Sequence, residues 1–240
     1  MHYSIKQNQK VIAYSNQECI PYYVYKYMER EWADDFLRGR IRLSELHQYQ
    51  KNEHIAGVHD AQEGLKQYVE HNVNGLYTRE RISANSAMRG AIQIAHPGSN
   101  YICLGAVGSW ERSAKALSFC CSESANDWEM AKDMNPNYDT CIQIEIIPFI
   151  ARVGRSLKGQ SFIEQAVRFL KVKYTGRTVD YVEGDEVKYD HDELKSSEYE
   201  NQKEWRILWS GKETTPDHFP IEDRKLCKYI SVSSYKPTSE

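Results

Sequence analysis

Residues 203–209, Lys-Glu-Trp-Arg-Ile-Leu-Trp, alternate between polar and apolar side chains. This alternation predicts a β-strand with one face in the core. Two tryptophans and Ile207 share the face that we expect to be buried, and Glu204 and Arg206 share the other, beside Leu208. A Glu-x-Arg pair on a strand is commonly a solvated ion pair of little energetic consequence. The alternative is a fixed carboxylate at the mouth of a cleft, and the strand itself leaves both interpretations open.

The rest of the chain reads as many short strands with a few short helices. Strand-like segments occur at 22–27, 40–44, 101–107, 116–122, 140–147, 168–174 and 228–233. Helical spacing or capping residues predict helices at 28–38, after 124–127, and at 161–166. This order indicates one α+β domain over residues 1–240 with a mostly antiparallel sheet. We expect residues 1–20 to be a lead-in segment and 234–240 a tail.

Composition narrows the classes of protein that the chain can represent. The formal net charge is −3, so the chain lacks the overall basic charge of non-specific nucleic-acid binders, although a local basic groove stays open. Residues 1–13 have no apolar signal core, and no run of 18 apolar residues exists. The six cysteines form no C-x-x-C pair, which favours reduced thiols. We therefore predict a cytoplasmic protein without a membrane-spanning segment.

Motifs spread over residues 22–210 resemble known families when they are taken in order. The segment Tyr25-Lys26-Tyr27, a helix at 28–38, Gly39 and then Arg42-Leu43-Ser44 is similar to the entry of the ADP-ribosyltransferase fold, in its DarT-type and tRNA phosphotransferase-like branches. The chain also resembles a bacterial family of unassigned function. The motifs shared with that family are Tyr-Lys-Tyr at 25–27, Phe-Cys-Cys-Ser at 119–122, Trp128 and Lys-Glu-Trp-Arg at 203–206.

The first resemblance implies an NAD site and a role for each matching residue. Glu204 would be the catalytic carboxylate, and Gln202, two residues before it, would lie near the acceptor nucleophile. Lys26 or Tyr27 stands where one branch has a histidine that anchors the NAD ribose, and the Ser-Thr-Ser strand of the other branch is absent. The remaining candidates for contacts with NAD are Ser44, Trp128 and Arg206. Trp128 is equally a core residue of a short helix.

The chemistry of NAD cleavage explains why such residue types are needed. Breaking the nicotinamide–ribose bond builds positive charge on the ribose, and a fixed carboxylate such as Glu204 stabilises it. An arginine can bind the pyrophosphate with its planar fork, for which Arg42 is the candidate. An aromatic ring can stack on nicotinamide, for which Tyr25 or Tyr27 is the candidate. Each of these side chains also has an ordinary structural interpretation as an ion-pair or core residue.

A second acidic pair, Asp60 and Glu63, suggests a different chemistry. On a helix the two carboxylates would share a face, and with Glu204 they could bind a hard metal ion and form a nuclease site. The ordinary interpretation is a solvated turn that Gly64 ends. The eight histidines include no pair at metal-ligand spacing, so the sequence itself predicts no metal centre.

The sequence thus leads to one main hypothesis and two alternatives. The main one is an ADP-ribosyltransferase with NAD as co-substrate, a bacterial toxin or anti-phage defence effector acting on RNA, DNA or protein and paired with an antitoxin. The alternatives are a non-catalytic nucleotide- or protein-binding module of the same fold and the metal-dependent nuclease. Pairing of Glu204 with Arg206 would favour the binding module, whereas Glu204, Arg42 and Tyr25 around one cleft would favour the transferase.

Overall fold

The computed structural model describes most of the chain. The described residues are 3–7, 9–14, 20–50, 65–70, 75–77, 101–103, 107–175, 178–180 and 191–237. Contacts divide the chain into two compact units. The first unit contains Met1–Ala61, Ala114–Val172 and Glu198–Glu240, and the second contains Gln62–Ser113 and Lys173–Ser197.

The second unit contains three small sheets. β5 (Leu65–Glu70) pairs with β8 (Val107–Arg112) and with β13 (Thr178–Asp180). The short strands β6 (Gly75–Tyr77) and β7 (Tyr101–Cys103) form a ladder, and β12 (Lys173–Tyr174) pairs with β14 (Leu194–Lys195) after the 3-10 helix η2 (His191–Glu193).

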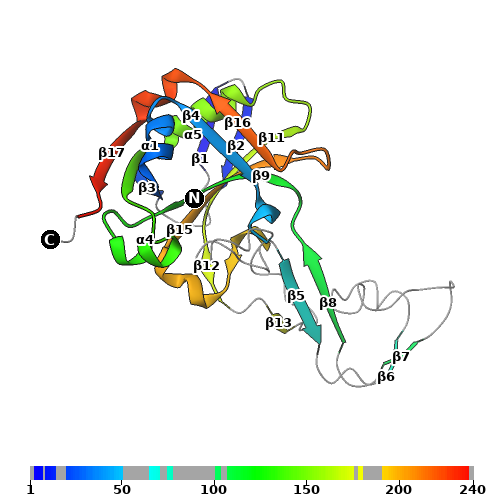
Figure 1. The fold of residues 1–240 in the computed structure, drawn as a ribbon. Coiled ribbons are helices and arrows are strands. Elements are labelled where there is room, and N and C mark those ends of the chain that lie inside the picture. Colours follow the sequence, from blue (N-terminus) through cyan, green and yellow to red (C-terminus); the bar gives the residue numbers. More distant parts are fainter. Residues whose placement is uncertain are drawn as a thin grey trace. The chain divides into compact units, whose positions relative to one another are not determined.

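A ten-stranded sheet forms the first unit (Figure 1). Its main path is β1-β2-β11-β15-β9-β3-β10-β17, and β4 joins β9 on one side and β16 on the other. The strands are β1 (Tyr3–Gln7), β2 (Gln9–Tyr14), β3 (Tyr23–Met28), β4 (Arg40–Glu45), β9 (Ala116–Ser122), β10 (Thr140–Glu145), β11 (Ile163–Lys171), β15 (Glu204–Gly211), β16 (His218–Glu222) and β17 (Ile230–Tyr235). Only the β2–β11 pair is parallel among these described ladders, which confirms an α+β fold with a mostly antiparallel sheet.

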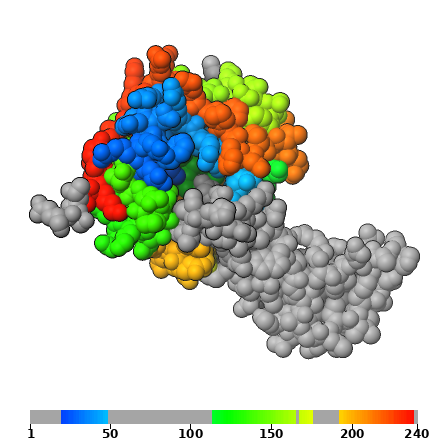
Figure 2. Space-filling view, in the orientation of Figure 1, coloured from blue at the N-terminus to red at the C-terminus, as the bar shows by residue number. Residues whose placement is uncertain are grey.

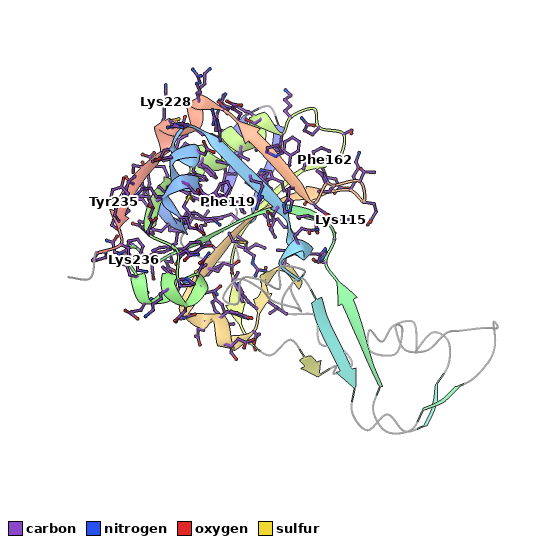
Figure 3. All side chains as sticks on the ribbon, in the orientation of Figure 1. Lys115, Phe119, Phe162, Lys228, Tyr235 and Lys236 are labelled. Carbon is purple, nitrogen blue, oxygen red and sulfur yellow. The ribbon has the colours of Figure 1, made fainter. Side chains whose placement is uncertain are left out.

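Helices in the first unit connect these strands and cover part of the sheet. They are α1 (Arg30–Leu37), α4 (Trp128–Met134) and α5 (Ile146–Ser156), with 3-10 helices η1 (Leu46–Gln50), η3 (Ser197–Gln202) and η4 (Arg224–Tyr229). Phe36 of α1 and Phe149 of α5 both pack on Phe119 of β9, with ring centroids 5.8 and 5.2 Å away. Phe119 therefore lies in the interior of this unit (Figure 3).

Strand β9 has a divided edge, which we call the β9 fork. Along one edge β9 pairs with β15 over its whole length. Along the other edge it pairs with β4 at Ser44 and with β3 at Tyr25, opposite Ser118 and Ser122 respectively. Between these two contacts the Nζ of Lys26 donates a hydrogen bond of 2.7 Å to the carbonyl oxygen of Cys120. β3 and β4 separate at this point. The side chain of Lys26 thus binds a β9 carbonyl that lies between the residues paired with β3 and those paired with β4.

Three expectations about secondary structure are wrong, each for a physical reason. Residues 3–7 and 9–14 form two strands of the large sheet rather than a lead-in. Residues 161–166 form a turn that enters β11 instead of a helix, because the segment completes a ladder with β15. The strand at 140–147 ends at Glu145, and Pro148 lies in the first turn of α5, where its missing N–H costs no hydrogen bond.

Other expectations are confirmed. The strands at 22–27, 40–44 and 116–122 and the helix after 124–127 are present within one or two residues, and Asp127 accepts the N-capping hydrogen bond from Met130 N. Among the described residues, no helix combines the length and apolar character needed to cross a bilayer.

Candidate functional site

Both faces of β15 are buried between Glu204 and Trp209, so the face that carries Glu204 is not solvated. Arg206 is 0% exposed and Glu204 is 5% exposed. The Nε of Arg206 donates a hydrogen bond of 2.7 Å to Oε1 of Glu204. The prediction of a half-buried strand is therefore wrong, and of the two interpretations of the Glu-x-Arg pair the solvated one does not hold. This buried pair is the feature around which we define the candidate site.

Register brings two further side chains onto the face of Glu204. Ser122 of β9 lies directly opposite Glu204, and Tyr25 of β3 lies directly opposite Ser122. Residues directly opposite one another in an antiparallel ladder project to the same side. Tyr25, Ser122 and Glu204 thus form a row across three strands at one side of the β9 fork, and Arg206 is the next residue of β15 on that face.

The backbone before Glu204 is held in an unusual conformation. Lys203 has φ +45°, in the left-handed region that residues with a Cβ rarely adopt. The Oγ of Ser122 donates to the carbonyl of Gln202 at 2.9 Å, and the N–H of Glu123 donates to the carbonyl of Lys203 at 3.0 Å. The turn that leads into Glu204 is therefore fixed against the end of β9.

Tyr27 and Trp128 lie together beside α4. The ring of Tyr27 meets Trp128 edge-on at 5.6 Å between centroids. The Tyr27 hydroxyl donates to the carbonyl of Ser124 at 2.9 Å and accepts from the N–H of Asp127 at 2.8 Å. Burial raises the pKa of Tyr27 well above its ordinary value. This tyrosine holds the loop before α4, and its use in stacking on nicotinamide, like that of Trp128, stays a prediction.

The other predicted contacts are distributed over the opening strand–helix–strand unit. Lys26 projects to the opposite face of β3 from Tyr25, with its Nζ 5.0 Å from the ring centroid of Phe119. Arg42 is exposed and lies opposite Pro220 in the β4–β16 ladder. Ser44 accepts at its carbonyl from the Oγ of Ser118 at 2.8 Å. The arginine that binds Glu204 is thus Arg206, and a pyrophosphate contact for Arg42 stays a prediction.

Metal chemistry has no support in the described part of the chain. Asp60 and Glu63 lie outside the described residues, so the three-carboxylate hypothesis stays a prediction. Within the described ranges, no three His, Cys, Asp or Glu side chains are grouped as a metal site would require. Burial raises the pKa of the Cys121 thiol, whose Sγ donates to the carbonyl of Trp205, which makes it an inert core residue.

Sequence reasoning missed a second buried ionisable pair. The backbone N–H of His47 donates to Oε2 of Glu45, at the end of β4, at 3.1 Å, and the Nδ1 of His47 lies 2.9 Å from Oε1 of Glu45; both side chains are buried. Burial opposes ionisation of Glu45, but hydrogen bonds from His47 outweigh it and lower the pKa of this carboxyl. The Glu-x-His spacing was visible in the sequence, but nothing marked either residue as buried. Ser122 was missed as well, because its pairing with Glu204 depends on long-range register.

The arrangement supplies an oriented carboxylate, a guanidinium that binds it, and an aromatic ring in the same row. Such a set can stabilise developing positive charge and stack on a planar ring. Beyond Arg206 the same face becomes apolar, because Leu208 packs with Leu46, Ala116 and Leu170. Comparisons with known protein families, with curated proteins and with solved structures find no match for this chain.

Proposed function

We propose that the chain is an NAD-dependent ADP-ribosyltransferase in which Glu204 is the catalytic carboxylate. In this proposal Glu204 stabilises the ribose as the bond to nicotinamide breaks, and Tyr25 stacks on the departing ring. Arg206 is a positioning residue that orients Glu204 through its hydrogen bond to Oε1. We also propose that the protein acts as a toxin or defence effector, in keeping with the resemblance of its motifs.

The observation that carries the proposal is the buried Glu204–Arg206 pair. Removing two charges from water costs several kcal/mol each, and apolar residues of similar volume often give greater stability. A second cost lies next to it, because Lys203 takes a left-handed conformation. Strained backbone and buried charge gather at functional sites more often than elsewhere. Their coincidence at Glu204 supports a chemical role for this carboxylate.

The proposal also implies a conformational requirement. Only 5% of Glu204 is exposed, so NAD can reach the carboxylate only if this face of β15 opens. Opening on binding is common in enzymes that exclude water from the reaction. Water exclusion suits ADP-ribose transfer, since water would otherwise compete with the acceptor for the ribose.

A labelled NAD assay tests the proposal. NAD labelled on the adenylate is incubated with the protein and separate RNA, DNA and protein acceptors, with and without EDTA. We expect label on one acceptor class in both conditions. Cleavage of the RNA or DNA acceptor without label, removed by EDTA and restored by magnesium or manganese, would instead point to the metal-dependent nuclease.

The matched variants separate chemistry from folding. Glu204→Leu with Arg206→Met removes the carboxylate together with the buried guanidinium that binds it. Glu222→Gln is the control, because Glu222 is an exposed glutamate of β16. We expect the double variant to stay folded and lose about 10²–10³-fold in turnover. Wild-type turnover in the folded double variant would refute the role of Glu204.

A second candidate function follows from the closure of the same site. Glu204 is bound by Arg206 and almost inaccessible, the arrangement that we associated with a non-catalytic module. Such a module would bind a nucleotide or a protein partner without turnover. Calorimetry that detects NAD binding to a protein showing no label transfer to any acceptor would favour the binding module over the transferase.

A further inference from the structure

Three segments of the first unit meet at Asp223, two of them at its carboxylate and one at its backbone N–H. Its Oδ2 accepts from the Nε of Arg152 and, at 3.1 Å, from the Oγ of Ser156, both on α5. Its Oδ1 accepts from the N–H of Lys225 in η4 at 3.0 Å. The Asp223 N–H donates to the carbonyl of Gly39, in the turn between α1 and β4, at 2.9 Å. We call this meeting point the Asp223 hub.

The hub brings its three segments into close approach. Gly39 has φ +81°, and a Cβ added there would lie 2.2 Å from the carbonyl oxygen of Asp223 and 3.1 Å from the Cα of Arg224. Only glycine therefore fits this turn. The pKa of Asp223 is lowered by the hydrogen bond from Arg152, so the hub carboxylate is ionised at neutral pH.

Exposed cations surround the hub and define what we call the basic surface. Each lies within five residues of a hub residue along the chain: Arg38, Lys158, Arg224, Lys225 and Lys228. Figure 2 shows the orange-red residues of η4 beside the blue residues of α1 and β4, and Figure 3 shows Lys228 at the rim of this unit. Packing at the hub therefore collects cations from three separate segments on one side of the unit.

Among the described residues, the nearby carboxylates that form ion pairs do so with Arg40 and Arg152. Asp35 and Glu222 both pair with Arg40, at 3.0 and 3.6 Å. Asp223 pairs with Arg152, which leaves Asp34 as the remaining exposed carboxylate on the adjoining turn of α1. The protein as a whole carries a net charge of −3, so this local excess of positive charge runs against its average.

We infer that the basic surface binds the phosphodiester backbone of a nucleic acid. Arginine forks and lysine ammonium groups on one surface are the groups that contact successive phosphates. A membrane fits less well, since no large apolar side chain is exposed in segments 38–42, 152–158 or 222–229 for insertion beside the charges. Resting on the proposed function, the inference makes RNA or DNA the acceptor that the surface delivers to the transferase site.

The test measures binding without NAD, so that it can fail independently of the transferase proposal. Fluorescence anisotropy of labelled single-stranded RNA, single-stranded DNA and duplex DNA is measured with the full chain at several salt concentrations. We expect affinity that falls steeply with salt, and the three probes identify the preferred form. Lys225→Ser with Lys228→Ser should lower the affinity at least about tenfold at 0.1 M salt and reduce the slope of log K against log salt by about 1.4–1.8.

The matched control is Lys132→Ser with Lys212→Ser, because both lysines are exposed and lie outside the hub segments. It should keep wild-type affinity and salt slope. The inference is overturned by the absence of salt-dependent binding, by equal loss in both double variants, or by stronger binding to polyglutamate or phosphatidylserine vesicles. Those last two results would assign the surface to an acidic protein or to a membrane. Glu204→Leu with Arg206→Met should still bind the oligonucleotide.

Discussion

The two faces of β15 are both buried, yet they are stabilised in different ways. On one face Trp205, Ile207 and Trp209 enter the large apolar core, where Trp205 stacks on Phe169 at 4.6 Å between centroids. On the other face Glu204 and Arg206 are buried as charged groups. Their burial costs free energy, which their mutual hydrogen bond offsets. One face thus gains from each apolar side chain that leaves water, about 1.5–3 kcal/mol apiece.

The comparison shows that two equally buried faces of one strand can be stabilised by different kinds of interaction. The apolar face spreads its stabilisation over many contacts, so the loss of one side chain leaves the others in place. On the polar face Glu204 and Arg206 bind each other, so the loss of either member leaves the desolvation cost of the other less well compensated. Substitutions on the two faces should therefore differ in whether a second substitution can compensate for the first.

The largest effect is expected from breaking the pair on the polar face. Glu204→Gln leaves Arg206 charged and buried, and it should lower the free energy of unfolding by about 3–5 kcal/mol. Adding Arg206→Met to Glu204→Leu removes both charges and should recover most of the loss. Urea denaturation of wild type, the single variant and the double variant measures this. A double variant as unstable as the single one would contradict a desolvation origin.

A smaller loss, without rescue, is expected on the apolar face. Ile207 is 0% exposed, and Ile207→Ala should lower the free energy of unfolding by about 3 kcal/mol through lost burial and a cavity. Ile207→Val should cost about 0.5–1.5 kcal/mol in the same urea experiment. If Ile207→Ala cost less than Ile207→Val, the two faces would not differ as described.

The sequence predicted which residues share each face of this strand but not the environment of the polar face. Alternation is local, so the positions of Trp205, Ile207 and Trp209 follow from a period of two. Glu204 meets Ser122 only because β9 and β15 pair in one particular register, which depends on contacts across the whole unit. Local patterns carry no information about that register, and hence none about the burial of Glu204.

The same limit applies to the other elements. The helix α1 and strand β10 were predictable from their periodicity. Helix α5 was not, since Pro148 marks a strand end as readily as the first turn of a helix. Strands β1 and β2 were missed, although Val-Ile-Ala-Tyr at 11–14 carries the β-branched and aromatic side chains typical of a strand. Of the predicted site, the structure brings Tyr25 and Glu204 into one row and places Arg42 in another ladder, opposite Pro220.

A gain in stability is expected at the turn before the polar face. Lys203 has φ +45°, which glycine adopts without steric cost. Lys203→Gly should therefore raise the free energy of unfolding by up to about 1 kcal/mol, partly offset by the greater freedom of glycine in the unfolded chain. Lys203→Val should lower it, since β-branched residues avoid this region. Thermal unfolding of both variants measures the difference, and equal melting temperatures would show that the turn is not strained.

The smallest expected effect is a loss of stability at acidic pH, caused by protonation of Glu123 beside Trp205. A hydrogen bond from Lys171 is the largest of the causes that lower the pKa of Glu123, and Trp205 donates its Nε1–H to the same carboxylate at 3.4 Å. A lowered pKa means that this contribution is present above the usual value of 4.5 and lost as the pH falls through the folded value. Because Glu123 is exposed, we expect less than about 1 kcal/mol.

Glu123→Gln is the control for this pH dependence. Stability measured by urea denaturation should fall less between pH 6 and pH 3 in the variant than in the wild type. Tryptophan fluorescence should report the change at Trp205 in the wild type. Identical pH profiles would remove Glu123 from the interactions that stabilise the apolar face.

The β9 fork has a consequence for biosynthesis. β9 pairs with β3 and β4, which are synthesised well before it. It also pairs with β15, which is synthesised well after it. At ordinary translation rates the interval between β9 and the end of β15 is on the order of 5–20 s. During that time the central strand has one open edge, and such an unpaired edge is prone to aggregation until Gly211 emerges. A ribosome that stalls before residue 204 releases a chain in which this sheet cannot close.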